Sequence, residues 1–427
     1  MLIKKLKALG AGLFMVLLAG CSTVSLDEPH GLCAPGSASA SPRSGDYACP
    51  EPAPTPAPRD VPPPREVEPA PVQTAPILLP GQEPAANAGS APAARGAGPV
   101  RVALLLPMNS STLGGAAEAV RAGFMASVER DGTGMTVDLI STGDGTADAL
   151  ASYADAARSH DVIVGPLARP AVSALAAAGN ITRPTVALNH PEPRGNLPRG
   201  MLVAGLSIED EARQAAEWAA REHPQGRVLI LSGNAPWAQR AASAFEARWN
   251  ELGHTGQRFP VPSLDGRVDQ AAIADLKARL DVDPPELMFA ALDVVELRQV
   301  RAQTDTAIPC YAGSAGNPGR APGMAATELN GLRVVDVPWL VRPDHRAVMV
   351  YPRPLELEQP LTMNRLYALG IDAFLVAREL ALRPGGPFVI DGVTGRLEVD
   401  PGGPRLQRRE AMAIYRDGNF EAVEAGP

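Results

Sequence analysis

The chain has 427 residues, and its 39 Lys and Arg against 47 Asp and Glu give a formal net charge of −8. Beyond the first ten residues no stretch is basic enough to indicate nucleic-acid binding. Lysine occurs only at Lys4, Lys5, Lys7 and Lys277, and Lys277 fits neither a phosphate-binding P-loop nor the Ser-x-x-Lys motif of serine acyl-enzymes. The composition therefore excludes both of these enzyme classes.

The first 20 residues have the pattern of a secretory signal peptide. Three lysines precede an apolar run from Leu9 to Leu18, which is too short to span a membrane and lacks a stop-transfer flank. The run ends in Leu18-Ala19-Gly20-Cys21, which resembles the lipobox of bacterial lipoproteins. We therefore predict a signal peptide over 1–20 and lipidation at Cys21, where several acyl chains give a firm anchor. The alternative is an ordinary export signal with an incidental cysteine.

Residues 21–99 form a segment rich in proline and alanine. Of the 44 prolines in the chain, 18 lie between Ser22 and Pro99, and each fixes φ and removes a backbone donor. Such a segment buries too little apolar surface to fold, so we predict a disordered, semi-rigid tether. Cys33 and Cys49 lie within it and either form a disulfide in an oxidising periplasm or remain two free thiols. A further hypothesis is that the tether contacts peptidoglycan.

From residue 100 onward, apolar runs alternate with helical periodicity. Continuous apolar runs predict buried parallel strands, and apolar residues three or four apart predict helices. The first half of this pattern gives four strands with three helices between them: 102–106, 114–130, 136–140, 147–159, 162–167, a helix to residue 178, and 185–189. This order predicts an open doubly wound sheet, the first lobe.

The same alternation returns after residues 201–206, where the chain crosses onward. Ser207 begins a helix with an acidic first turn. The elements predicted next are 228–231, 237–252, a strand near Phe259, 270–280, 287–292, 294–303, 308–312, 332–335, a helix over 362–382, and short strands at 388–390, 395–399 and 411–416. We therefore predict an α/β body over 100–427 with two lobes. Lobe 1 takes about 100–205 and part of the 332–382 return, and lobe 2 takes about 206–331 and the C-terminal strands.

Two such lobes with the chain crossing between them are the organisation of the type I periplasmic-binding-protein fold. The residues resemble one branch, the LppC/LpoA family of penicillin-binding-protein activators. The segments that carry the resemblance are Val102–Pro107, Ala117–Phe124, Val164–Leu167, Ala187–Asn189, Ser207–Ala212, Ala244–Trp249, Arg365–Ala373 and Gly392–Leu397.

The resemblance implies a regulator with no chemistry of its own. It would be an outer-membrane lipoprotein, facing the periplasm, that reaches through the peptidoglycan and stimulates a class A penicillin-binding protein. Ser22 after Cys21, where aspartate would retain a lipoprotein, agrees with outer-membrane sorting. Better-known members carry an N-terminal helical-repeat domain where this sequence has the tether. Either the tether supplies the reach alone or the partner differs.

No motif in the sequence indicates a catalytic or metal site. None of the six histidines has the spacing of metal ligands, and His160, His223 and His254 sit at predicted helix ends, where a surface cap role is expected. Cys310 follows an apolar run and is expected to be a buried hydrophobe. We predict no catalytic residue, no metal and no cofactor.

A ligand between the lobes is the remaining alternative, with the chain acting as a solute-binding lipoprotein for an amino-acid-like molecule. Ligands of open α/β sheets bind beyond the carboxyl ends of the strands. The residues expected there are Asn109, Ser110, Ser111, Gly165, Pro166, Leu167, Asn189, Asn234, Trp237 and Asp293. The competing interpretation is that these residues form turns and cap helices.

Overall fold

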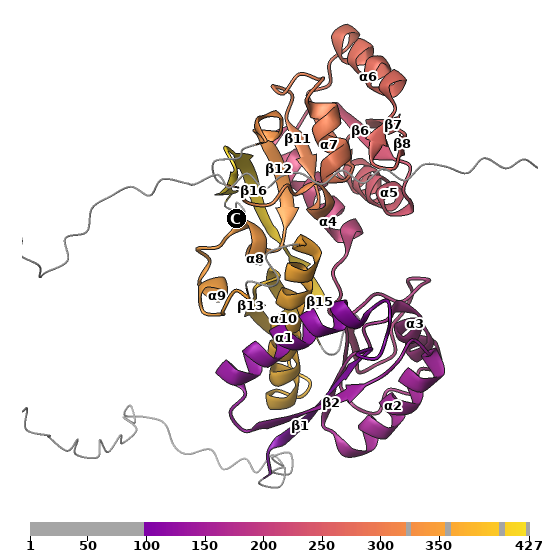
Figure 1. The fold of residues 1–427 in the computed structure, drawn as a ribbon, viewed down its shortest axis with the longest axis vertical. Coiled ribbons are helices and arrows are strands. Elements are labelled where there is room, and N and C mark those ends of the chain that lie inside the picture. Colours follow the sequence, from indigo (N-terminus) through magenta and orange to yellow (C-terminus); the bar gives the residue numbers. More distant parts are fainter. Residues whose placement is uncertain (1–97, 322–325, 355–359, 401–405, 424–427) are drawn as a thin grey trace, which may run out of the picture. The chain divides into compact units, whose positions relative to one another are not determined.

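The computed structural model describes residues 98–321, 326–354, 360–400 and 406–423. The predicted signal peptide, residues 21–97 of the predicted tether and the cysteines Cys21, Cys33 and Cys49 lie outside these residues. The described residues belong to one compact unit, which contains two α/β sheets (Figure 1).

The first sheet has five parallel strands in the order β2-β1-β3-β4-β5. The prediction of four strands was wrong by one, because Met201–Val203 pairs with β4 before the chain crosses onward. The elements of this half are β1 (Val100–Leu106), α1 (Gly114–Asp131), β2 (Met135–Ser141), α2 (Thr146–Ser159), β3 (Val162–Val164), α3 (Arg169–Ala178), β4 (Thr185–Ala187) and β5 (Met201–Val203).

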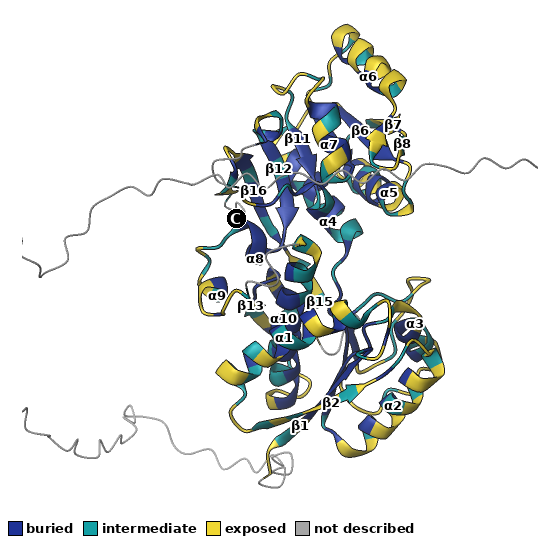
Figure 2. Ribbon diagram, in the orientation of Figure 1, coloured by how far each residue is buried: buried dark blue, intermediate teal, exposed yellow. Residues whose placement is uncertain are grey.

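Strand β1 is apolar on both faces because helices cover both faces of the sheet. Successive side chains of a strand point to opposite sides. Val102, Leu104 and Leu106 pack with α1 and the later helix α10 (Leu361–Leu382), whereas Ala103 and Leu105 pack with α2 and α3. The continuous apolar run therefore reports two-sided burial, as the sequence predicted (Figure 2).

The second sheet has seven strands in the order β17-β16-β12-β11-β10-β6-β7, with β16 and β17 antiparallel to their neighbours. Helices α4 and α5 cover one face, and α6 and α7 cover the other. The elements are α4 (Ile208–Glu222), β6 (Val228–Gly233), α5 (Pro236–Glu251), β7 (Gly256–Val261), α6 (Gln270–Val282), β10 (Leu287–Ala291), α7 (Val294–Arg301), β11 (Cys310–Ala312), β12 (Leu332–Asp336), β16 (Ala411–Arg416) and β17 (Asn419–Val423).

The remaining strands form small antiparallel sheets. β8 (Ser263–Leu264) pairs with β9 (Arg267–Val268). β13 (Phe388–Asp391), β14 (Arg396–Val399) and β15 (Leu406–Arg409) form a three-stranded sheet whose apolar side chains join the core of the first sheet. The C-terminal strands are thus divided, since only β16 and β17 extend the second sheet.

The return segment from β12 ends in the long helix α10. Before it come the short helices α8 (Pro338–Val341) and α9 (Arg346–Met349), which the sequence pattern did not predict, and the 3-10 turns η1 (Ser314–Gly316) and η2 (Thr327–Leu329) precede β12. Helix α10 begins one residue before its predicted start and is buried around most of its circumference. No helix among the described residues is both long and apolar enough to cross a membrane.

Helices α10 and α1 lie side by side at very short range (Figure 1). A Cβ atom added to Gly123 would lie 1.9 Å from the Tyr367 carbonyl oxygen, and one added to Gly370 would lie 2.1 Å from the Val120 carbonyl oxygen. Each glycine therefore faces the backbone of the other helix, and no side chain fits between them.

This contact generates a stability prediction. Gly370→Ala should lower the free energy of unfolding by about 1–3 kcal/mol, because the two helices must separate to admit the methyl group. The matched control is Gly115→Ala in α1, where nothing lies within 4 Å of the new Cβ. There the better helix propensity of alanine should leave stability unchanged or slightly raised. Urea denaturation measures both, and equal stability of the two variants would contradict the packing.

Candidate functional site

The ligand residues predicted from the first lobe lie in loops after β1, β3 and β4. The Oγ atom of Ser110 accepts hydrogen bonds from the backbone N–H groups of Thr112 and Leu113 at 3.2 and 2.8 Å, just before α1. Its neighbour Asn109 uses its backbone N–H to reach the Thr142 carbonyl oxygen at 3.0 Å, and Ser111 is exposed.

The loops after β3 and β4 hold each other. Asn189 Nδ2 donates to the Leu167 carbonyl oxygen at 3.1 Å, and the backbone N–H of Leu188 donates to the Pro166 carbonyl oxygen at 3.1 Å. Gly165 has φ of 116°, and a Cβ atom there would lie 2.2 Å from the Leu105 carbonyl oxygen. Glycine is therefore required by the close approach of two strands.

The residues predicted from the second lobe are also engaged locally. Asn234 Nδ2 donates to the Ser263 carbonyl oxygen at 3.0 Å, so it holds the β8 strand. Asp293 is the N-cap of α7 and forms a capping box with Glu296. Trp237 lines a small cavity of about 10 Å³ beside β10.

A much larger cavity, of about 770 Å³, lies elsewhere, and none of the ten predicted residues lines it. Its walls come from the loop after β4, from β5, from α4 and α5, and from β15. The lining residues are His190, Pro191, Arg194, Gly195, Leu197, Val203, Glu209, Asp210, Arg213, Gln214, Glu217, Gln239, Arg240, Ser243, Leu406, Gln407, Arg408 and Arg409. The strand-end rule considers only residues at the carboxyl ends of strands. It misses this cavity because the polar groups of the cavity lie mainly on outer helix faces and on a short edge strand.

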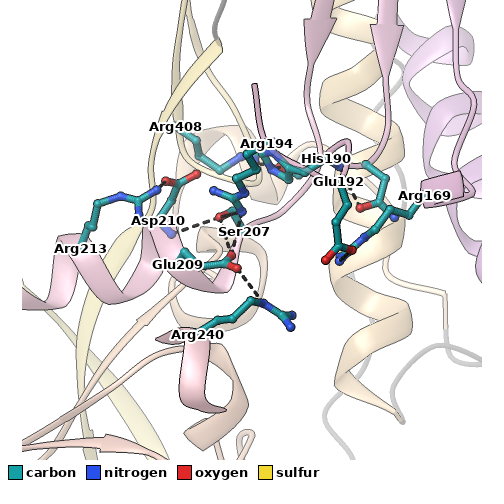
Figure 3. Close-up of polar contacts among 12 residues, drawn as sticks. Arg169, His190, Glu192, Arg194, Ser207, Glu209, Asp210, Arg213, Arg240 and Arg408 are labelled. Atoms are coloured by element: carbon teal, nitrogen blue, oxygen red, sulfur yellow. Dashed lines mark hydrogen bonds and ion pairs between the residues drawn. The ribbon is translucent and has the colours of Figure 1, made fainter. Parts of the chain in front are cut away.

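Glu209 is the centre of the polar contacts in this cavity (Figure 3). Arg194 Nη2 lies 2.8 Å from Glu209 Oε2, and Arg240 Nε lies 3.0 Å from Glu209 Oε1. Burial opposes ionisation of this carboxyl, but a backbone N–H and the two guanidinium groups outweigh it and lower the pKa of Glu209. Glu209 therefore joins the loop after β4, which carries Arg194, to α5, which carries Arg240.

His190 lies at the edge of the same cavity as a neutral imidazole. Burial, together with the positive charge of Arg194, lowers the pKa of His190 below its ordinary value. Its Nε2 atom lies 3.0 Å from the Gly205 carbonyl oxygen. Because a carbonyl only accepts, Nε2 carries the proton and Nδ1 is the acceptor.

Charged side chains with little exposure join the two halves of the fold. Arg365 of α10 donates from Nε to Asp336 Oδ1 at 2.9 Å and from Nη2 to Asp336 Oδ2 at 2.6 Å. The same Nη2 reaches the Ser314 carbonyl oxygen at 2.8 Å, and the Ser314 N–H donates to Glu211 Oε2 at 2.8 Å. Helix α10 of the first core is thus tied to β12, η1 and α4.

A second set of contacts surrounds Arg408 of β15. Its guanidinium donates to the carbonyl oxygens of Gly205 and Ala204 at 3.0 and 2.6 Å and to Thr394 Oγ1 at 3.0 Å. The Asp372 carboxylate in turn accepts from the N–H groups of Val393 and Thr394 at 3.0 and 2.7 Å. These bonds fix the crossing segment after β5 against the turn between β13 and β14.

Two buried glutamates near these contacts favour their protonated forms. Burial and the negative charge of Asp336 raise the pKa of Glu211 to about 7. Burial and the charge of Glu211 raise the pKa of Glu410 well above its ordinary value. Glu410 Oε2 also has no hydrogen-bond partner among the described residues, which agrees with a neutral carboxylic acid.

Three of the histidines and Cys310 occupy structural positions. His160 and His223 follow the last residues of α2 and α4, as predicted, but His160 is only 6% exposed, so its expected surface position was wrong. His254 stacks on Trp249, and Cys310 is fully buried in β11. Across the described ranges, no three His, Cys, Asp or Glu side chains gather closely enough to hold a metal ion.

The raised pKa of Glu211 predicts a pH dependence of stability. The unfolded chain releases this proton near pH 4.5 and the folded chain near pH 7, so the folded state binds more protons in between. Stability therefore falls as the pH rises through this window, by on the order of 3 kcal/mol for this group. Glu211→Gln keeps an oxygen for the Ser314 N–H and should flatten the fall.

Urea denaturation at several pH values from about 5 to 8 measures the effect. Glu421→Gln, at an exposed carboxylate, is the control and should leave the profile unchanged. A Glu211→Gln profile parallel to that of the unmodified protein would show that Glu211 ionises normally.

Comparisons with known proteins agree with the observed fold. Residues 95–418 match the family model described as "LppC putative lipoprotein". The penicillin-binding protein activator LpoA of Edwardsiella piscicida is 29% identical over 320 residues, which cover 65% of this chain and 44% of that protein. The chain spans about half the length of the curated relatives it matches.

Solved structures match about three quarters of the chain. One, titled as a "putative branched-chain amino acid ABC transporter" from Chromobacterium violaceum, has a TM-score of 0.62 at 30% identity and covers 74% of this chain and 100% of that one. The LpoA C-domain of Haemophilus influenzae, described as a regulator of PBP1A, has a TM-score of 0.60 at 22% identity and covers 76% of this chain and 100% of that one. They confirm the two-lobed periplasmic-binding fold. The family model spans most of the residues of this chain, so the chain belongs to the LppC/LpoA family.

Proposed function

We propose that this protein is an outer-membrane lipoprotein that binds and activates a class A penicillin-binding protein and so stimulates peptidoglycan synthesis. The observation that carries the proposal is the family match over 95–418, which includes relatives named as penicillin-binding protein activators. The activity, the partner and the membrane are carried over from this membership.

The local chemistry supports a binding role in place of catalysis. The polar side chains at the strand ends, such as Ser110, Asn189 and Asp293, are engaged in caps and loop bonds. The charged groups with shifted pKa values at the junction of the two halves are bonded to one another and to the backbone. Such groups hold a structure, whereas a catalytic group must face a substrate.

The solute-binding alternative requires these strand-end residues to bind a ligand. An amino-acid-like ligand at the strand ends would have to replace the bonds that Ser110, Asn189 and Asn234 already make. Those bonds would be lost on binding, which reduces the net gain. The activator proposal requires no such exchange, so we favour it.

The anchor is tested by changing the cysteine of the lipobox-like sequence. Cys21→Ser should abolish incorporation of labelled palmitate and release the protein from the membrane fraction, because a hydroxyl does not replace the thiol that receives the lipid. Gel fluorography and fractionation after separation of inner and outer membranes measure both. Cys33→Ser is the matched control and should keep label and location. Label retained in the Cys21→Ser variant would contradict the assignment.

The activity is tested with purified components. The mature chain carrying Cys21→Ser should raise the rate at which a class A synthase from the same organism polymerises labelled lipid-linked precursor. A glycosyltransferase of unrelated fold serves as control and should not respond. An unchanged rate, together with no association of the two proteins in analytical ultracentrifugation, would rule the partner class out.

A further inference from the structure

Three links connect the two halves of the fold, and each of them carries a buried carboxyl group. The first link runs from β5 into α4, whose first turn contains Glu211. The second leaves β12 at Asp336 and leads to α10, and the third joins β15 to β16 through Glu410. Asp336 is 1%, Glu211 4% and Glu410 9% exposed. A buried carboxyl group costs free energy unless it is paired with a cation or protonated.

The chain brings these three carboxyl groups to one place. Ala411, the residue after Glu410, pairs with Asp336 in the antiparallel ladder of β12 and β16. The backbone N–H of Glu410 donates to Gln214 Oε1 at 2.9 Å, and Gln214 lies three residues after Glu211 on the same face of α4. The charge of each group therefore acts on the others.

The two guanidinium groups at this place leave Glu211 and Glu410 without a cation of their own. Arg365 binds Asp336 through two nitrogens, and Arg408 donates to two backbone carbonyl oxygens and a threonine hydroxyl. Glu211 accepts from a backbone N–H, whereas Glu410 Oε2 has no hydrogen-bond partner within the described ranges. Burial and the charge of Glu211 raise the pKa of Glu410, and the opposing effect of Arg408 is smaller.

The remaining charged groups that face this place are already engaged. Asp210 of α4 adds a negative charge and is paired with Arg213. Asp372 of α10 accepts hydrogen bonds from the backbone of the turn between β13 and β14. These described groups therefore supply no further cation that could balance an ionised glutamate.

We propose that Glu211 and Glu410 act as a proton-controlled latch at the links, and that the loss of their protons changes the relative orientation of the two halves. With both glutamates protonated, Asp336 is the charged member of the three, and Arg365 neutralises it. Once the protons leave, three negative charges meet at one buried point, and their repulsion is relieved when α4 and β16 move apart. Because α4 follows the first link and β16 follows the third, this movement turns one half against the other.

The latch operates near neutral pH. The pKa of Glu211 is about 7, so a rise in pH through this value ionises Glu211 first. The protonated arrangement is therefore favoured at lower pH, and the altered arrangement is favoured at higher pH. The latch depends on the links alone and is independent of the proposed activator role.

The experiment measures the distance between the two halves as a function of pH. The mature chain, with the three cysteines before residue 98 changed to serine, carries spin labels at Ala177→Cys in α3 and Ala274→Cys in α6. Both alanines are exposed, one in each half, and the remaining Cys310 is fully buried. Double electron–electron resonance should show that the mean distance between the labels shifts by about 2 Å or more between about pH 6 and about pH 8.

Glutamine is neutral at every pH and so imitates a protonated glutamate. Glu211→Gln and Glu410→Gln should each reduce the shift, and the double variant should keep the distance of the acidic condition throughout. Glu421→Gln, at an exposed carboxylate, is the matched control and should keep the full shift. The melting temperature at about pH 6 checks that each variant is folded. A distance that does not change with pH in the unmodified protein, or a full shift in the folded double variant, would overturn the proposal.

Discussion

Helix α10 carries two charged side chains, the buried Asp372 and the largely buried Arg365, and the junction between the halves of this fold depends on them. Arg365 and Asp372 lie seven residues apart and therefore on one side of the helix. Arg365 binds Asp336 at the end of β12, and Asp372 accepts from the backbone of the turn at Val393 and Thr394. The helix that completes the core of the first sheet is thereby bonded to the second sheet and to the returning chain.

These charges also decide which other groups ionise. Asp336 is fully buried and forms an ion pair with Arg365. The negative charge of Asp336 helps to keep Arg365 protonated. Glu211 and Glu410 lie close enough to this pair to sense Asp336, and each has a raised pKa. Breaking a buried pair by removing one partner leaves an uncompensated charge and is strongly destabilising. The junction therefore tolerates neutral glutamates but not the loss of Arg365 or Asp336.

The sequence predicted the elements whose burial is periodic or two-sided. It missed the elements that form only by pairing with a neighbouring strand. The apolar run of β1 and the spacing of α10 follow from burial against neighbours. β15 reads Leu-Gln-Arg-Arg and becomes a strand only because β14 offers its edge. The strand-end rule located the polar loops correctly in space but could not show that Ser110 or Asn189 bonds within its own half. The large cavity was missed because outward helix faces normally meet water.

The cavity and the buried junction share a wall. Occupancy of the cavity is therefore linked to the geometry of the junction. Gln214 lines the cavity, donates to the Arg408 carbonyl oxygen at 3.3 Å and accepts from the Glu410 N–H at 2.9 Å. The seam between the halves is also held at Glu209, which pairs with Arg194 and Arg240. A ligand can shift an equilibrium between arrangements of the halves only by its difference in affinity for them. Such a difference arises most directly at this seam, because Arg194 and Arg240 belong to opposite halves.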